Sequence, residues 1–274
     1  MTYTTDIEEY HEIVAENPDN KNILIEGDSW VSHPQVKNLA EQFHQLNNNL
    51  NILNLAAPGD MAIAVLDKYT HEYETLVTLL DSPQFGYKFD MIFLSAAGND
   101  IIGPEVRYFV DDKVEDDGRY GEQYLNAFFD CVVDYLKRDF ERFIELRNTT
   151  QLNSTTPIIT HSYSRLMTRQ KGTEAFGVKF NKGWLDVYLR DKGFTDQGEK
   201  NQIAAGMLGR FRSALEQIQA ENFLVVDTLD TLLGAGNEPD VGLFHDEIHP
   251  NDAGFERLAR TIMQAAREAG YWPE

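Results

Sequence analysis

Short apolar runs alternate with longer helical patterns along almost the whole chain, and this alternation constrains the fold more than any other feature of the sequence. Each run is five to seven residues long and nearly continuous in apolar character. That pattern is typical of a β-strand that is buried on both faces of a sheet. The predicted strands cover residues 22–26, 50–55, 89–95, 157–161 and 223–227.

The segments between the strands repeat apolar residues every three or four positions, as one face of an α-helix does. The clearest stripe runs from Tyr120 to Ile144. Strands that alternate with helices pair in parallel through right-handed crossovers. We therefore expect one doubly wound α/β domain over residues 1–274, with a parallel five-stranded sheet. The predicted helices cover residues 35–46, 61–80, 120–144, 199–220 and 252–269.

The chain is strongly acidic, with 24 Lys and Arg residues against 45 Asp and Glu residues and a formal net charge of −21. Nucleic acids and anionic membrane surfaces are both bound mainly through Lys and Arg. We therefore expect no nucleic-acid partner. The sequence has no run of about 18 apolar residues, so we also expect no integral membrane association. The polar, acidic N-terminal segment is unlike a signal peptide, and we expect a cytoplasmic location unless a signal has been removed.

Chemically versatile residues follow the predicted strands. In an open parallel sheet the carboxyl ends of the strands share one edge, and ligands bind there. Small residues, hydroxyls, amides, carboxylates and a histidine gather at this edge, which a purely structural sheet would not need. They lie in the segments 27–30, 56–60, 96–100, 161–163 and 245–250.

A serine, a histidine and an aspartate at this edge could perform acyl transfer. Ser29 lies in a strand-to-helix turn directly after Gly27. A serine hydroxyl is a poor nucleophile until a base takes its proton. His249 could be that base, and Asp246 could hold its imidazole in the tautomer that accepts the proton. Each feature alone would also suit a helix cap or a surface turn.

Acyl transfer also needs hydrogen-bond donors aimed at the developing oxyanion. The backbone N–H groups of Ser29 and Gly59 and the side-chain amide of Asn99 could provide three. The neighbouring aspartates are expected to fix turns or cap helices, and these are Asp28, Asp60 and Asp100.

Four sequence blocks resemble the SGNH (GDSL) hydrolases, in the order that this family has them. The blocks are Gly27-Asp28-Ser29, Asn54-x-Ala-x-x-Gly59-Asp60, Gly98-Asn99-Asp100 and Asp246-x-x-His249-Pro250. The resemblance spans residues 27–250. It implies a flavodoxin-like three-layer α/β/α sandwich that hydrolyses esters or thioesters without a metal or organic cofactor. It also implies that Ser29, Asp246 and His249 are catalytic, with Ser29, Gly59 and Asn99 forming the oxyanion hole.

Three residues depart from the common family pattern. Ala56 and Ala97 stand where the family often has glycine, and each adds only a methyl group. Trp30 follows the serine where leucine is frequent, which bears on the acyl pocket. Trp30 is therefore a candidate substrate contact, together with His161 and Tyr163, which the fourth strand brings to the same edge.

Two long segments leave this edge, at about residues 101–118 and 162–198. Long loops are uncommon in compact domains and often act as lids or binding walls. The second segment holds several aromatic residues, including Trp184 and Phe194. They could contact a substrate or form a satellite core under the loop.

Two other functions fit parts of the sequence. His245 and His249 have the i, i+4 spacing of a zinc-binding helix. However, Asp246 stands where such a motif has its catalytic Glu, and Pro250 disfavours helical geometry at His249. A carbohydrate- or acyl-binding module without activity could share the fold, since fold does not fix function. His33 is expected to lie at the surface.

The sequence therefore predicts a serine esterase that acts on a small-molecule ester. Acetylated sugars, phospholipids, short aliphatic esters and thioesters all remain open as substrates. The oligomeric state is also left open by the sequence.

Overall fold

A computed structural model describes residues 2–82, 86–172, 174–175, 178–179 and 182–273. It contains all five of the predicted strands. They are β2 (Lys21–Gly27), β3 (Leu50–Asn54), β4 (Met91–Ser95), β5 (Ile158–His161) and β8 (Phe223–Val226).

Among the described residues these strands belong to one six-stranded sheet, in which all neighbouring strands run parallel. The order is β1-β3-β2-β4-β5-β8, so the five predicted strands have the flavodoxin-like order. The sixth strand, β1 (Tyr3–Thr4), pairs with β3 at one edge of the sheet. The prediction of five strands was one short, because a two-residue strand in a polar segment leaves no apolar run to detect.

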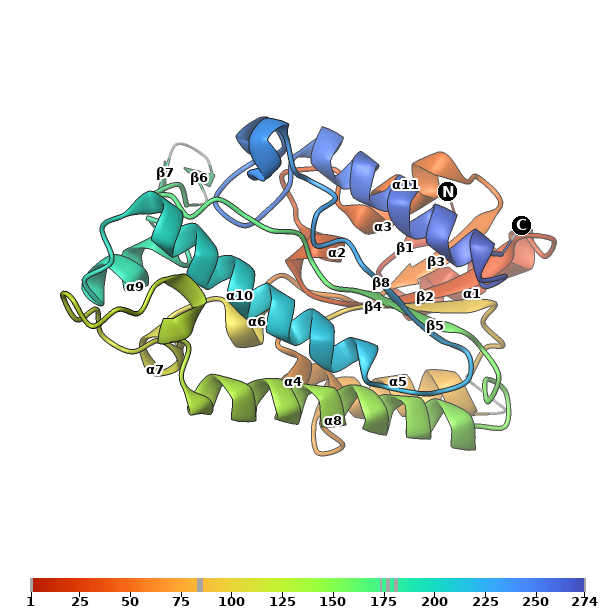
Figure 1. Cartoon of the computed structure of the whole chain (residues 1–274). Helices are drawn as coiled ribbons and strands as arrows, with labels where there is room; N and C mark the ends of the chain where they lie inside the picture. The colour runs from red at the N-terminus through yellow and green to blue at the C-terminus, as the bar shows by residue number, and fades with distance from the viewer. Residues whose placement is uncertain (1, 83–85, 173, 176–177, 180–181, 274) are drawn as a thin grey trace.

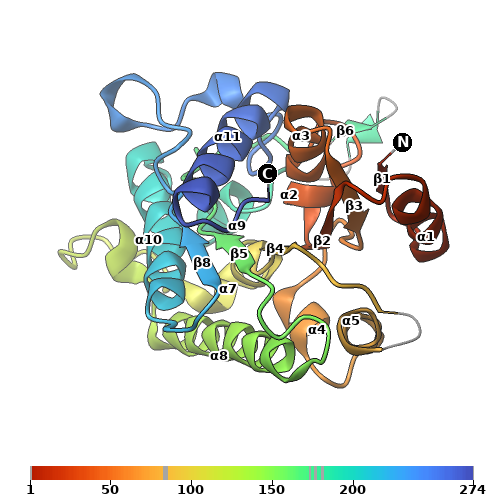
Figure 2. The same cartoon turned by 90° about the vertical axis from the view of Figure 1, so that its right-hand side faces the viewer.

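Helices cover both faces of the sheet, which gives the predicted three layers (Figures 1 and 2). On one face lie α3 (Leu39–Leu46) and α11 (Asp252–Glu268). On the other lie α4 (Ala62–Leu66), α5 (His71–Asp81) and α8 (Ala127–Thr149). Because both faces are covered, β3 and β4 are buried along their whole length. None of the helices formed by the described residues has the length and apolar character needed to cross a membrane.

Two of the predicted helices are interrupted. Residues 61–80 form α4 and α5 instead of one helix, because the Thr70 side chain caps the start of α5. Residues 120–144 begin as a short 3-10 helix, η1 (Gly121–Tyr124), and α8 starts only after its capping residue Asn126. In both places a capping side chain restarts the helix, which apolar periodicity does not reveal.

The other elements include α10 (Gln197–Glu216), which corresponds to the predicted helix 199–220. The rest were not predicted, because they are terminal or short. They are α1 (Ile7–Glu16), α2 (Ser29–Ser32), α6 (Gly98–Ile101), α7 (Val106–Phe109), α9 (Asp186–Asp191), β6 (Glu174–Ala175), β7 (Val178–Lys179), η2 (Ala235–Asn237) and η3 (Val241–Leu243).

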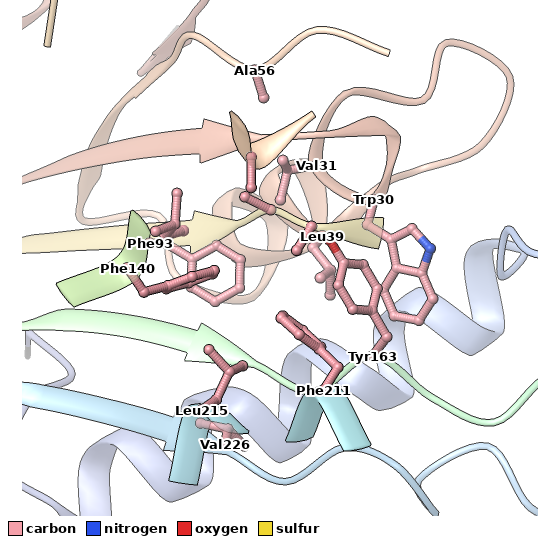
Figure 3. Packing of buried hydrophobic residues seen from close by; sticks show 14 of the residues in the cluster. Trp30, Val31, Leu39, Ala56, Phe93, Phe140, Tyr163, Phe211, Leu215 and Val226 are labelled. Atoms are coloured by element: carbon pink, nitrogen blue, oxygen red, sulfur yellow. The ribbon is translucent and has the colours of Figure 1, made fainter. Parts of the chain in front are cut away.

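Side chains from the sheet and the surrounding helices pack into a common hydrophobic core. Figure 3 shows part of it, with Phe93 from β4, Phe140 from α8, and Phe211 and Leu215 from α10. These residues are buried almost completely. The core therefore fixes the strands whose carboxyl ends carry the polar residues singled out in the sequence.

A buried carboxyl group in β2 predicts a pH-dependent stability. Glu26 is 3% exposed, and burial raises its pKa from 4.5 to about 8. The folded chain thus holds a proton that the unfolded chain releases near pH 4.5. This contribution to the free energy of unfolding is complete below that pH, falls as pH rises, and levels off above about pH 8.

We therefore expect the contribution of Glu26 to the free energy of unfolding to fall between pH 6.5 and 8, by up to about 1.4 kcal/mol per pH unit. Glu26→Gln should remove most of this slope, because the amide cannot ionise and its oxygen can still accept from the Gly27 N–H. Urea unfolding of both proteins between about pH 6.5 and 9 measures the difference. Parallel curves for the two proteins would contradict the assignment.

Candidate active site

The turn after β2 passes unusually close to β4. Gly27 has φ of 145°, and a Cβ at this position would lie 1.9 Å from the carbonyl oxygen of Ser95. The next residue, Asp28, donates its backbone N–H to the same oxygen at 2.8 Å. Only glycine allows this approach. The first residue of the Gly-Asp-Ser block is therefore required by the path of the backbone.

Asp28 fixes the start of α2, the short helix that begins at Ser29. One of its carboxylate oxygens accepts the Trp30 N–H at 2.9 Å, and the other accepts the hydroxyl of Tyr163. Burial raises the pKa of Asp28 to about 6, although both hydrogen bonds lower it. Tyr163 in turn accepts the backbone N–H of Gly98 at 3.0 Å. The aspartate thus caps the helix, as expected from the sequence, and connects the segments after β2, β4 and β5.

The structure brings together the three residues that the sequence singled out for acyl transfer. The hydroxyl of Ser29 lies 2.8 Å from Nε2 of His249, a residue 220 positions later in the chain. Nδ1 of His249 lies 2.7 Å from a carboxylate oxygen of Asp246. All three side chains are largely buried, and Ser29 is 7% exposed. The three side chains therefore form one continuous hydrogen-bonded chain, the arrangement of a serine, a base and an orienting carboxylate.

The loop that carries the histidine is shaped by the same aspartate. The second carboxylate oxygen of Asp246 accepts the backbone N–H groups of Ile248 and His249, at 2.9 and 2.8 Å. Burial alone would raise the pKa of Asp246. The hydrogen bond and charge of His249, together with the two backbone N–H groups, outweigh burial and hold that pKa below its ordinary value. Asp246 is therefore ionised at neutral pH and can stabilise a positively charged imidazole.

Two of the three proposed oxyanion donors, Gly59 and Asn99, come from neighbouring segments that are joined by a hydrogen bond. Asn99 lies in α6 and donates its amide N–H to the carbonyl oxygen of Asp60 at 2.8 Å. Gly59 is exposed in the loop after β3 and has φ of 96°. The Asp60 side chain also accepts the N–H of Ala57 at 3.1 Å. The contact between Asn99 and Asp60 thus holds the loop that carries Gly59 against α6.

The residue before α6 is one of the three departures from the common family pattern. Ala97 adopts φ of 90°, a left-handed conformation in which a Cβ is unfavourable. The Cβ of Ala97 therefore adds backbone strain two residues before Asn99.

Asp100, in the same helix as Asn99, accepts the N–H groups of Ala62 and Ile63, at 2.7 and 3.3 Å, and so caps α4.

The three candidate substrate contacts form an aromatic cluster. The rings of Trp30 and Tyr163 lie 4.9 Å apart at 80°, and Trp30 stacks on His161 at 5.4 Å (Figure 3 shows Trp30 and Tyr163). Each residue is at most 5% exposed. Trp30 and Tyr163 line a small cavity beside Ser29, and His161 donates to or accepts from Ser95 at 2.9 Å. Trp30 and Tyr163 therefore lie beside Ser29, whereas His161 contacts both of them from the strand.

His33 is not at the surface, and this part of the sequence prediction was wrong. It is 5% exposed, and its ring lies 4.4 Å from the ring of His249. Burial and the neighbouring charge of His249 lower its pKa to about 4, so His33 is neutral at pH 7. Its Nδ1 accepts the backbone N–H of Gln35 at 3.2 Å. Packing against another histidine of the site, which the sequence could not show, explains the burial.

The arrangement does not match the zinc-helix hypothesis. Residues 245–248 form bends, and His249 has no regular structure, so this segment is not a helix. Among the described residues, the group that could hold a metal ion is His33, Asp246 and His249, and His245 is outside it. Both ring nitrogens of His249 already have partners, Ser29 and Asp246. The predicted pair of histidines therefore lacks the geometry of that motif.

One important residue was missed by the sequence analysis. Glu247 is completely buried, and its carboxylate accepts the backbone N–H groups of Arg169, Trp184, Leu185 and Asp186. Burial raises its pKa, although all four hydrogen bonds lower it. Glu247 therefore joins the long segment 162–198 to the loop that carries the catalytic histidine candidate.

The hydrogen bonds between Glu247 and the segment 162–198 place an aromatic side chain beside His249. The ring of Trp184 meets the ring of His249 edge-on, at 5.1 Å and 87°. Phe194, from the same segment, is buried against Tyr124 at 4.9 Å. The segment thus supplies both a wall of the site and a satellite core. Two further aromatic residues of the segment, Phe176 and Phe180, lie outside the described residues.

Glu247→Gln should destabilise the protein. Glutamine has one acceptor oxygen instead of two, so at least one buried N–H loses its partner, at about 1–3 kcal/mol each. Urea unfolding at pH 7 measures this loss, with Glu238→Gln as a control for the same substitution at an exposed residue. Equal stability of the two variants would show that the Glu247 junction is not a stabilising feature.

Comparison with known proteins gives a family match and structures of similar fold. Residues 18–262 match the family model of the GDSL-like lipases and acylhydrolases. A Streptococcus pneumonia protein provisionally assigned as a platelet activating factor has a similar structure. Its TM-score is 0.51 at 17% identity, over 94% of this chain and 89% of that protein. A member of the lipolytic G-D-S-L family from Veillonella parvula DSM 2008 gives a TM-score of 0.47 at 18% identity, over 89% and 97%.

The search of the curated proteins found no match. The family model nevertheless covers well over half of the sequence, and it includes all four of the blocks that resemble the SGNH hydrolases. The chain therefore belongs to the GDSL-like lipase/acylhydrolase family and is an ester-hydrolysing enzyme.

Proposed function

We propose that this enzyme hydrolyses carboxylic esters with Ser29 as nucleophile, His249 as general acid and base, and Asp246 as the residue that orients His249. The observation that carries the proposal is the pair of hydrogen bonds at 2.8 and 2.7 Å that joins the three side chains. The low exposure of the site supports it, because hydrogen bonds to developing charges are stronger away from water.

The reaction begins when Ser29 attacks the ester carbonyl carbon and passes its proton to Nε2 of His249. The carbonyl oxygen becomes an oxyanion, which accepts hydrogen bonds from the N–H groups of Ser29 and Gly59 and from the Asn99 amide. His249 then gives the proton to the alcohol oxygen as the carbon–oxygen bond breaks. The alcohol leaves, and an acyl-serine remains.

Water completes the cycle by the same route. His249 takes a proton from the water molecule, the hydroxide attacks the acyl-serine, and a second oxyanion forms at the same donors. Collapse of this intermediate releases the carboxylic acid, and the proton returns to the Ser29 oxygen. Asp246 stays ionised throughout and stabilises the imidazolium form of His249.

A groove beside His33, whose ring packs against that of His249, supports a substrate ester with a polar alcohol group. This groove of about 560 Å³ lies beside His33 and the loop 56–58. Most of its lining side chains carry hydroxyl, amide or carboxyl groups. They include Tyr3, Ser32, Gln35, Asn38, Glu41 and Asp252. This supports acetylated carbohydrates ahead of phospholipids among the substrates considered; short aliphatic esters and thioesters are open to the same chemistry.

Replacing Ser29 by Ala should abolish hydrolysis of p-nitrophenyl acetate down to background, because the acyl-serine cannot form. Ser154→Ala is the control for the same substitution, because Ser154 is exposed and lies in the turn before β5, at the opposite end of the parallel strands from Ser29. It should keep most of the activity. Activity in the wild type should also survive EDTA.

Two results would contradict the mechanism. The first is activity that persists in Ser29→Ala, and the second is activity that EDTA removes. A wild-type protein that binds an acetylated sugar without hydrolysing any ester would favour the inactive binding module.

Asn99→Ala tests the oxyanion donor separately. Loss of one such donor typically costs about 10²–10³ in kcat. The expected loss is therefore in kcat, with the fold checked by circular dichroism because the contact to the Asp60 carbonyl is lost as well. An unchanged kcat in a folded variant would remove Asn99 from the oxyanion hole.

A further inference from the structure

A small apolar cavity lies directly beside the nucleophile. It is lined by Ser29, Gly98 and Asn99 on one side. Its apolar wall comes from five separate parts of the chain. The wall residues are Trp30, Ile102, Tyr163, Leu166, Leu208 and Ile248.

The stereochemistry of ester cleavage assigns a role to this cavity. His249 must protonate the leaving oxygen, so the alcohol lies on the histidine side of the reacting carbon. The oxyanion points to its donors, and the acyl substituent takes the remaining direction. The cavity contacts Ser29 and Asn99, and His249 is not among the described residues that line it. This assigns the cavity to the acyl side. The larger groove is lined by His33, whose ring packs against that of His249, which assigns the groove to the alcohol side.

The cavity is also very small. Its volume is about 20 Å³, room for the centres of one or two water-sized groups. The methyl group of an acetyl ester is of that size, whereas the propyl group of a butyrate ester has three carbon atoms.

The wall of the cavity is held firmly in place. Ile102, Leu166 and Leu208 are 7%, 4% and 1% exposed, so each is packed on its far side as well. Tyr163 is fixed through its hydroxyl by Asp28 and Gly98. Close-packed side chains of this kind do not move aside for extra methylene groups without a cost of about 1–3 kcal/mol.

We propose that this cavity is the acyl subsite and that it restricts the enzyme to acetyl esters, with Leu208 as a residue that sets the limit. The inference rests on the proposed function, because it takes Ser29 as the nucleophile. The proposed mechanism allows short-chain esters in general, and this inference selects the acetyl group among them.

The test compares p-nitrophenyl acetate, butyrate and hexanoate, which share one leaving group and differ only on the acyl side. For the wild type we expect kcat/KM to fall by roughly 10- to 200-fold from acetate to butyrate, and further for hexanoate. Leu208→Ala should enlarge the cavity and raise the ratio of butyrate to acetate kcat/KM by about tenfold or more. This ratio is independent of how much of each preparation is folded and active.

Leu215→Ala is the matched control, because Leu215 is in the same helix, is equally buried and does not line the cavity. It should leave the ratio unchanged. Removing a buried leucine side chain costs about 2–5 kcal/mol of stability. If Leu208→Ala does not fold, Leu208→Val removes a single carbon and should shift the ratio in the same direction by a smaller amount.

Each outcome bears on a different claim. A wild type that cleaves butyrate and hexanoate as well as acetate, through Ser29, would overturn the acetyl restriction and leave the mechanism intact. A Leu208 variant whose ratio changes no more than that of Leu215→Ala would overturn the assignment of the acyl subsite to this cavity and to Leu208. Acetate hydrolysis that persists in Ser29→Ala would overturn the mechanism itself.

Discussion

The hydrogen bond between Ser29 and His249 joins two residues that are 220 positions apart, and it forms only if the whole sheet is in place. Ser29 follows β2, near the middle of the sheet, while His249 lies beyond β8, the last strand. Parallel pairing from β2 through β4 and β5 to β8 brings both to the same edge. Local structure contributes little to this contact, because α2 has only four residues. The core that orders the strands therefore also sets the distance between the Ser29 hydroxyl and Nε2 of His249.

Carboxylates that bind backbone N–H groups determine the loops at this edge. Asp28 caps α2, Asp100 caps α4, and Asp246 shapes the loop that carries His249. Glu247 joins that loop to the segment that carries Trp184. A buried carboxylate costs desolvation energy, and several N–H donors compensate for it while fixing the backbone geometry. The site is thus held by contacts between loops of different strands, and not by any single element.

The predictions succeeded where a residue pattern reflects a repeated physical environment. The five main strands are buried on both faces, so their apolar runs were visible in the sequence, as were the long amphipathic helices. The segments carrying Ser29, Gly59, Asn99 and His249 follow from the rule that parallel strands end at one edge. The strand β1, the break before α5 and the burial of His33 were missed, because they depend on long-range pairing or a single capping side chain. Glu247 was missed for a similar reason, since nothing in the sequence distinguishes a buried glutamate from an exposed one.

The central claim is that Ser29 becomes covalently bonded to the acyl group during turnover. A small p-nitrophenyl methylphosphonate ester tests this most directly, because an activated serine displaces p-nitrophenolate from phosphorus and keeps a stable adduct. The account predicts about one equivalent of p-nitrophenolate released per enzyme molecule. It also predicts a single adduct, which peptide mass spectrometry locates on Ser29, and no labelling in His249→Ala. Complete inactivation with the adduct on another residue, or with no adduct at all, would contradict the account.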